Sequence, residues 1–286
     1  GVIMKLKVAL CQMNVVDNKE KNIKKAISMI KKAKNEGSDI AILPEMFNCP
    51  YENEKFKEYA EFSEDSYTLK SIAETSKNEN IHVLAGSIPE KEINTKTGKE
   101  KIYNTSFLFD DTGEILGYHR KMHLFDIDVK DKIYFKESDT LNSGNSVTVI
   151  DTKSKIGKIG IGICYDIRFL ELSRIMSLKG AKILIYPGAF NLTTGPDHWE
   201  LLFRSRALDN QVFTIGVSPS LNEFNSYHAY GHSIVCNPWG KIVKKASYEE
   251  ELLISEIDLK EVDKVREELP ILKNRRNDIY ELKNLD

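Results

Sequence analysis

The hydrophobic and polar positions of the first fifty residues follow two different periods. Residues 5–13 form a mostly apolar run rich in β-forming residues, which predicts a buried strand. In residues 19–36 the apolar positions recur at helical spacing, and Gly37 is a favourable residue for ending a helix. A short apolar segment, residues 39–43, predicts a second strand that ends at Pro44-Glu45.

The same order of elements recurs in the second half of the chain. Residues 158–164 predict a strand, residues 169–178 a helix that ends at Gly180, and residues 181–186 another strand that ends at Pro187-Gly188. In both halves the helix-ending glycine lies seven residues before the proline, at 37 and 44 and at 180 and 187. This weak internal repeat predicts two related β-α-β halves that pack together.

Hairpin-like segments accompany both units. Residues 102–109 and 114–119 flank one predicted turn, and residues 232–236 and 241–244 flank another. Parallel units with added antiparallel strands predict mixed sheets with helices outside, an α/β fold of the layered α+β kind. No Pro-, Gly- or Ser-rich linker divides the chain, so we expect one domain over about residues 5–258. A last helix at residues 261–269 and the tail up to residue 286 are expected to dock on the domain or on a partner subunit.

Composition narrows the classes of protein that fit. Of the 286 residues, 41% are hydrophobic and 29% charged, which excludes a disordered or collagen-like chain. The net charge of −2 argues against nucleic acid as a partner, and no apolar run is long enough for a membrane span. The N-terminal residues show no secretory signal, and the four cysteines are far apart, as reduced thiols are. We therefore expect a cytoplasmic protein.

Several common site motifs are missing from the sequence. It contains no phosphate-binding P-loop, no His-Glu-x-x-His and no Gly-x-Ser-x-Gly. The six histidines show no tight metal-binding spacing. We therefore expect neither a metal nor an organic cofactor.

Three polar residues stand where apolar strands end, at the edge where active sites of α/β sheets gather. Glu45 and Cys164 each follow an apolar strand, and Lys121 follows the second hairpin strand. A thiol attacks a carbonyl as a thiolate, a buried carboxylate can take its proton, and a lysine can stabilise the oxyanion. Each residue alone also fits an ordinary role, namely core thiol, helix-start carboxylate and surface charge. The residues by themselves leave a cysteine hydrolase as a hypothesis.

Longer segments around these residues resemble the nitrilase superfamily of carbon–nitrogen hydrolases, and closely its ω-amidase branch. The resemblance spans about residues 7–278 and is carried by residues 43–47, 119–126, 163–169, 188–200, 204–211, 231–233 and 237–240. It implies an α-β-β-α sandwich of two mixed sheets with a pseudo-two-fold repeat. It also implies a homodimer or a larger homo-oligomer.

The resemblance implies a role for each matching residue. Cys164 is the nucleophile that forms a thioester, and Glu45 is the base that moves its proton. Lys121 binds the oxyanion together with the backbone N–H of Tyr165. Glu137 corresponds to a second glutamate that the family places beside the lysine and the substrate amide.

The same resemblance implies the substrate. An ω-amidase hydrolyses the terminal amide of 2-oxoglutaramate or 2-oxosuccinamate to the 2-oxo acid and ammonia, with no cofactor. Arg168 is expected to bind the distal carboxylate of this 2-oxo acid monoamide. Phe190 and Thr194 resemble the rest of that clamp, and Tyr51 and Met122 are expected to line the pocket.

Two other functions stay open at this point. One is another amidase of the superfamily, acting on a deaminated glutathione-like or N-carbamoyl substrate. The other is a hydrolase fold that has lost its activity and serves as a scaffold. The sequence also departs from its relatives at Cys49, where serine is common, and at residues 53–55. We expect Cys49 to be a packed thiol that behaves as a small hydrophobic residue; the alternative is a thiol at the pocket mouth that makes activity sensitive to oxidation.

Overall fold

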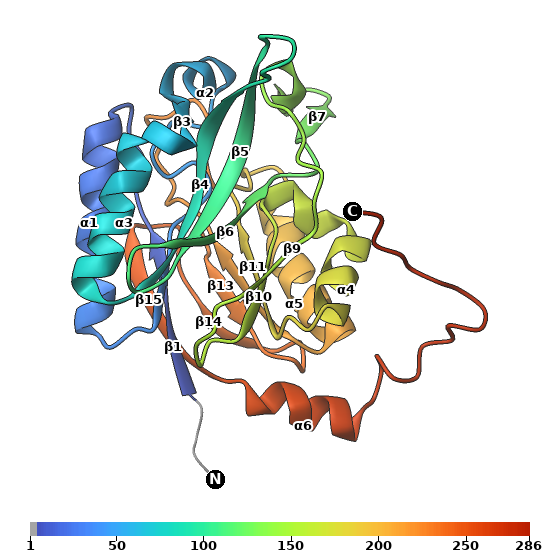
Figure 1. Cartoon of the computed structure of the whole chain (residues 1–286). Helices are drawn as coiled ribbons and strands as arrows, with labels where there is room; N and C mark the ends of the chain where they lie inside the picture. The colour runs from blue at the N-terminus through green and yellow to red at the C-terminus, as the bar shows by residue number, and fades with distance from the viewer. Residues whose placement is uncertain (1–4) are drawn as a thin grey trace.

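Two β-sheets lie face to face with helices on their outer sides in the computed structural model, which describes residues 5–286 (Figure 1). Residues 1–4, where the sequence predicts no secretory signal, lie outside the described residues. The predicted layered fold is confirmed. Among the described residues, no helix is long and apolar enough to cross a membrane.

The first sheet combines parallel and antiparallel strands. Strands β1, β2 and β4 are parallel neighbours, and β15 and the β5–β6 hairpin add to them antiparallel. Strand β3 pairs with β4 at one end. The strands are, in sheet order, β15 (Glu251–Asp258), β1 (Lys5–Gln12), β2 (Ile40–Ile42), β4 (His82–Ile93), β5 (Glu100–Phe109) and β6 (Ile115–Arg120), with β3 at Glu61–Phe62.

The second sheet repeats this arrangement. Its central strands β10, β11 and β12 are parallel, and antiparallel strands flank them on both sides. The sheet order is β14 (Ile242–Lys245), β13 (Ile234–Cys236), β12 (Phe213–Val217), β11 (Ile183–Pro187), β10 (Lys158–Ile161) and β9 (Thr148–Asp151). A separate hairpin, β7 (Asp126–Val129) and β8 (Ile133–Lys136), follows the first sheet in the chain.

Helices cover the outer face of each sheet. The apolar faces of α1 (Lys19–Asn35) and α3 (Tyr67–Glu79) pack on the first sheet, and α4 (Leu170–Leu178) and α5 (Glu200–Asn210) pack on the second. A third core, rich in Ile, Leu and Val from both sheets, fills the space between them. The α-β-β-α order follows, because each sheet has two apolar faces to bury. The remaining helices are α2 (Asn53–Tyr59) and α6 (Lys260–Glu268).

The predicted internal repeat corresponds to β1-α1-β2 in one half and β10-α4-β11 in the other, each with its two strands as parallel neighbours. Both predicted hairpins are also present. One prediction is wrong: the strand expected at residues 158–164 ends at Ile161, and Cys164 instead begins a short helical turn, Cys164–Arg168. The backbone of Cys164 has a φ of 45°, a left-handed conformation that cannot continue a strand.

The C-terminal segment follows α6 along the outside of the sandwich. Gln211 donates a hydrogen bond to the carbonyl of Leu269 at 2.5 Å. Arg275, Tyr280 and Leu282 line a cleft together with residues of α4 and α5, and Figure 1 shows the last residues returning toward α4. The division into one domain and a docking tail stays a prediction.

Candidate active site

Four ionisable side chains from distant parts of the chain meet inside the sandwich. Glu45 follows β2, Lys121 follows β6, Glu137 follows β8, and Cys164 follows β10. All four are buried. The structure therefore brings together every residue of the predicted Glu–Lys–Glu–Cys set.

Glu45 is fixed by donors from both sheets. Its Oε1 accepts hydrogen bonds from Lys121 Nζ at 3.1 Å and Asn104 Nδ2 at 2.8 Å, and its Oε2 accepts one from the backbone N–H of Ala189 at 2.7 Å. The loop that carries Glu45 packs directly on Gly86, where an added Cβ would lie 1.5 Å from the carbonyl oxygen of Leu43. Only glycine permits this approach, which sets the position of the carboxylate.

Lys121 lies between the two glutamates. Its Nζ is 2.6 Å and 3.1 Å from the two carboxylate oxygens of Glu137, and 3.4 Å from the hydroxyl of Tyr51. Burial lowers the pKa of Lys121, but the negative charges of Glu137 and Glu45 outweigh burial and hold that pKa above its ordinary value. Burial raises the pKa of Glu137 against the opposing effect of Lys121. The ammonium group stays charged at neutral pH.

Cys164 begins the turn Cys164–Arg168 with its thiol beside Glu45. Burial, followed by the charge of Glu45, raises the pKa of this thiol well above its usual value. A Cβ added at Gly188 would lie 3.2 Å from the Cα of Cys164, so glycine leaves room for the turn. The free site therefore holds a neutral thiol next to a carboxylate base, rather than a preformed thiolate.

Tyr51, which was predicted to line the pocket, also contacts both glutamates of the site. Its hydroxyl donates to Glu137 and also lies 3.3 Å from Glu45 Oε1. Its ring contacts that of Tyr227, with centroids 4.5 Å apart. Tyr227 in turn donates to the carbonyl of Ala189 at 2.5 Å. A phenol donor thus joins the two carboxylates that share Lys121.

The residues predicted to bind the distal end of the substrate lie at the other end of the Cys164 turn. Arg168 is half-buried, with its guanidinium 4.9 Å from the ring centroid of Phe190 and 3.1 Å from Nδ1 of His198. Burial lowers the pKa of Arg168 somewhat, and the group remains a cation. Thr194 is buried, and its hydroxyl and backbone N–H are both directed at the Oδ1 of Asn191. Phe190 and His198 therefore contact Arg168, whereas Thr194 hydrogen-bonds to Asn191.

The two other predicted residues lie near this turn. Met122 is half-buried and packs against the core of the second sheet. Tyr165, directly after Cys164, has its ring 5.5 Å from that of Phe125 and 5.3 Å from that of Phe169. The ring of Tyr165 therefore packs among aromatic side chains.

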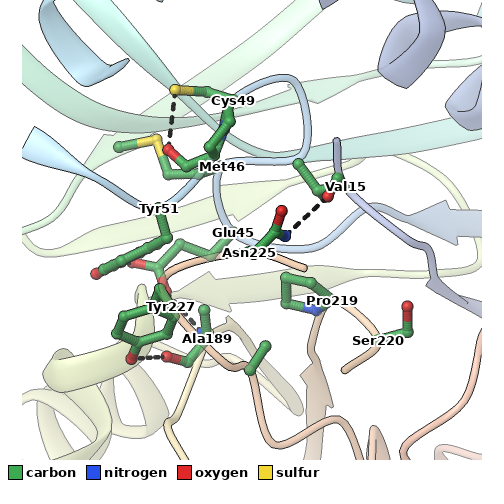
Figure 2. Close-up of a pocket in the computed structure, with 12 residues that line it drawn as sticks. Val15, Glu45, Met46, Cys49, Tyr51, Ala189, Pro219, Ser220, Asn225 and Tyr227 are labelled. Atoms are coloured by element: carbon green, nitrogen blue, oxygen red, sulfur yellow. Dashed lines mark hydrogen bonds between the residues drawn. The ribbon is translucent and has the colours of Figure 1, made fainter. Parts of the chain in front are cut away.

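A small cavity adjoins Glu45. Figure 2 shows Glu45 between Tyr51 and Tyr227, with Asn225 and Ser220 farther along the wall. Cys49 also lines this cavity and donates to the carbonyl of Pro50 at 3.2 Å, while burial raises its pKa well above the usual value. Cys49 is therefore a buried thiol rather than a reactive one.

Sequence reasoning missed two polar residues of the site, Asn104 and Asp166, and it predicted Tyr51 as a pocket residue without its hydroxyl contacts to the glutamates. Asn104 lies in the middle of β5 between buried neighbours. A polar residue inside an apolar strand was the available signal, because buried polar groups need partners. Among residues 5–286, no group of three or more His, Cys, Asp or Glu side chains is placed to hold a metal ion.

A buried thiol together with a buried carboxylate and a buried ammonium group is the set of groups that a cysteine hydrolase of acyl–nitrogen bonds requires. The family model for carbon-nitrogen hydrolases matches residues 7–267. The chain is 45% identical to the omega-amidase NIT2 of Homo sapiens, over 96% of both proteins. It is 48% identical to nitrilase homolog 2 of Dictyostelium discoideum, over 98% of this chain and 83% of that one.

Solved structures agree with this relationship. The crystal structure of Nit3 from Saccharomyces cerevisiae, a member of branch 10 of the nitrilase superfamily, is similar with a TM-score of 0.85 and 42% identity. The match covers 95% of this chain and 97% of that one. The chain belongs to the carbon–nitrogen hydrolase family and is an amidohydrolase of the nitrilase superfamily.

The raised pKa of Cys164 predicts how its alkylation depends on pH. A raised pKa lowers the thiolate fraction at neutral pH, so the rate constant with iodoacetamide should keep rising between about pH 7 and pH 9.5. The rate is followed by mass spectrometry of the peptide that contains Cys164. Cys11 and Cys236 are fully buried and lie outside the site, so these thiols serve as slow internal references. A plateau reached below about pH 8 would show a preformed thiolate and contradict the assignment.

Proposed function

We propose that this protein is an ω-amidase, which hydrolyses 2-oxoglutaramate and 2-oxosuccinamate to the 2-oxo acid and ammonia. The observation that carries the proposal is the placement of a half-buried arginine, Arg168, on the same short turn as the buried Cys164. One turn thus holds a nucleophile for the amide and a cation for a carboxylate a few atoms away. The full-length similarity to an omega-amidase supports the same function.

In the first half of the reaction, Glu45 accepts the thiol proton of Cys164 as the sulfur attacks the amide carbon. The amide oxygen becomes an oxyanion that accepts hydrogen bonds from the Lys121 ammonium and the backbone N–H of Tyr165. Glu45 then gives its proton to the amide nitrogen, the carbon–nitrogen bond breaks, and ammonia leaves. A thioester between Cys164 and the acyl group remains, and Glu45 is again a carboxylate.

The second half repeats the steps with water. Glu45 accepts a proton from a water molecule whose oxygen attacks the thioester carbon, and Lys121 again stabilises the oxyanion. The carbon–sulfur bond breaks, and the proton on Glu45 returns to the sulfur of Cys164. The 2-oxo acid leaves, and the site is restored.

Glu137 keeps Lys121 in place through this cycle. Glu45 is neutral whenever it carries a proton, so Glu137 then supplies the negative charge that Lys121 needs nearby. The hydroxyl of Tyr51, which contacts both glutamates, keeps Glu137 hydrogen-bonded in both states. A buried ammonium group with a constant counterion is available to each of the two oxyanions.

Substrate selection is assigned to the far end of the turn. Arg168 binds the distal carboxylate, and Phe190, against which the guanidinium lies, supports it. Thr194 and Met122 complete the wall around the short acyl chain. A pocket of this kind favours an acyl group that ends in a carboxylate over a neutral one.

We also propose that the protein works in the cytoplasm as a homodimer or a larger homo-oligomer. Its four cysteines are buried and unpaired, as expected in a reducing compartment. Leu201 and Leu208 on α5 are 63% and 46% exposed, and the neighbouring Trp239 is 48% exposed. Large exposed apolar side chains on one face are typical of a subunit interface.

The proposal is tested by ammonia release from 2-oxoglutaramate, glutamine, a deaminated tripeptide and an N-carbamoyl amino acid. We expect rapid release from 2-oxoglutaramate alone. Turnover of a different substrate would keep the chemistry of Cys164 and assign the protein to another amidase. Inactivity on all four would favour a scaffold.

Replacement of Arg168 by alanine tests the clamp. We expect kcat/KM for 2-oxoglutaramate to fall by roughly 100-fold, the loss of two charge-assisted hydrogen bonds of about 1.5 kcal/mol each. Turnover of a short amide without the distal carboxylate should change little. The control is Arg174→Ala on α4, since Arg174 is bonded to Asn210 and Asp209 instead. Equal losses on both amides would refute the role of Arg168.

A further inference from the structure

The buried carboxylate of Asp166 connects the two sheets beside the active site. Its Oδ2 accepts hydrogen bonds from the backbone N–H of Ile163 at 3.0 Å and from Nε2 of His119 at 2.9 Å. Its Oδ1 accepts two from His123, from the backbone N–H at 3.0 Å and from Nδ1 at 2.8 Å. Each oxygen thus has two partners, and together they come from both halves of the fold.

These partners enclose Lys121. His119 and His123 lie two residues before and two residues after it, and both side chains end on the same carboxylate. Within the first sheet, the backbone N–H of Lys121 donates to the carbonyl of Asn104 at 2.9 Å. Asp166 therefore adds the connection from the Lys121 segment to the second sheet.

The same carboxylate closes the turn that presents Cys164. The side chain of Asp166 accepts from the N–H of Ile163, and its own backbone N–H donates to the carbonyl of Ile163 at 3.0 Å. Cys164 lies inside this closed loop with a φ of 45°. A left-handed conformation costs an L-residue about 1–2 kcal/mol, so surrounding contacts have to hold it.

Hydrogen bonds from two histidines favour the charged form of the Asp166 carboxylate. Burial raises its pKa, but the hydrogen bonds from His119 and His123 prevail and hold the pKa below its usual range. The other nitrogen of His119 contacts the hydroxyl of Thr148 at 2.7 Å, and the ring of His123 stacks on Phe169 at 3.7 Å. Both imidazoles are therefore fixed from two sides.

We propose that Asp166 is a positioning residue, whose carboxylate sets the separation between the Lys121 ammonium and the Cys164 sulfur across the two sheets. The proposal rests on the assigned roles of Cys164 and Lys121 and not on the identity of the amide. An oxyanion donor acts only where the oxyanion forms, and a displacement of about 1 Å can cost about 100-fold in rate. Because Asp166 hydrogen-bonds to the Lys121 segment and to the Cys164 turn, it limits any displacement of the ammonium group relative to the sulfur.

The variant Asp166→Asn tests this role while keeping the side-chain size. An amide directs an N–H₂ group at two of the four donors, so two of the four hydrogen bonds that hold the Lys121 segment and close the Cys164 turn are lost. We expect kcat to fall by about 100-fold at temperatures well below Tm, with KM within about threefold of the wild type. Alkylation of Cys164 by iodoacetamide should slow by about tenfold, because the thiol shifts from its base.

The matched control is Glu90→Gln, also a buried acid replaced by its amide. Glu90 accepts hydrogen bonds from Thr105 and from Arg120, the residue before Lys121, so its contacts stay within the first sheet. This variant should lower Tm and leave kcat and the alkylation rate within about threefold, because the connection between the sheets is intact.

A second variant covers the case in which Asp166→Asn does not fold. His123→Ala removes one side-chain donor at a half-buried position, and kcat should fall by about tenfold with little change in KM. The proposal is overturned if the folded variants keep kcat and alkylation rates within about threefold while Tm falls. If the wild type is inactive on 2-oxoglutaramate, the alkylation rates still decide the role of Asp166, since they require no amide substrate.

Discussion

The structure depends on one buried ammonium group held between two buried carboxylates. Glu45 and Glu137 have no access to solvent, and Lys121 lies within 3.1 Å of both. Loss of one partner from a buried ion pair costs about 3–5 kcal/mol, because the remaining charge is left without compensation. In the proposed mechanism the same three charged groups serve as the base, the oxyanion donor and a fixed counterion. The stability of the fold and the proposed reaction therefore both require this ion-paired cluster. The loops after β2, β6 and β8 carry its three residues.

The residues of the site come from both sheets of the sandwich. Glu45 and Lys121 follow strands of the first sheet, and Cys164 follows a strand of the second. Their separation is set where the sheets meet, by polar contacts between them such as the bond from the N–H of Ala189 to Glu45. The interior between the sheets is apolar, and apolar contacts are not directional, whereas hydrogen bonds fix the distance and direction between the groups that they join. Polar connections beside the site therefore fix its geometry.

Much of the fold and part of the site were predictable from the sequence. The apolar periods of residues 5–43 and 158–186 identify the parallel strands and their helices. Strand ends then select Glu45 and Cys164, because active sites of α/β sheets gather at the carboxyl ends of the strands. Glu137 was found only through the resemblance to a family, because its loop has no distinctive local pattern. The contacts of Tyr51 and Asp166 join residues more than forty positions apart and depend on side-chain directions. The strand at residues 158–164 was predicted too long, because the left-handed turn at Cys164 leaves no trace in residue propensities.

In the proposed mechanism, Cys164 carries the acyl group. Ammonia release from 2-oxoglutaramate by Cys164→Ala tests this role, compared with Cys236→Ala, the same change at a buried thiol on β13. We expect Cys164→Ala to keep a normal Tm and to lose at least about 10⁴-fold in kcat, because the nucleophile is gone, while Cys236→Ala keeps its turnover. Turnover by Cys164→Ala at more than about one hundredth of the wild-type rate would contradict the thioester mechanism.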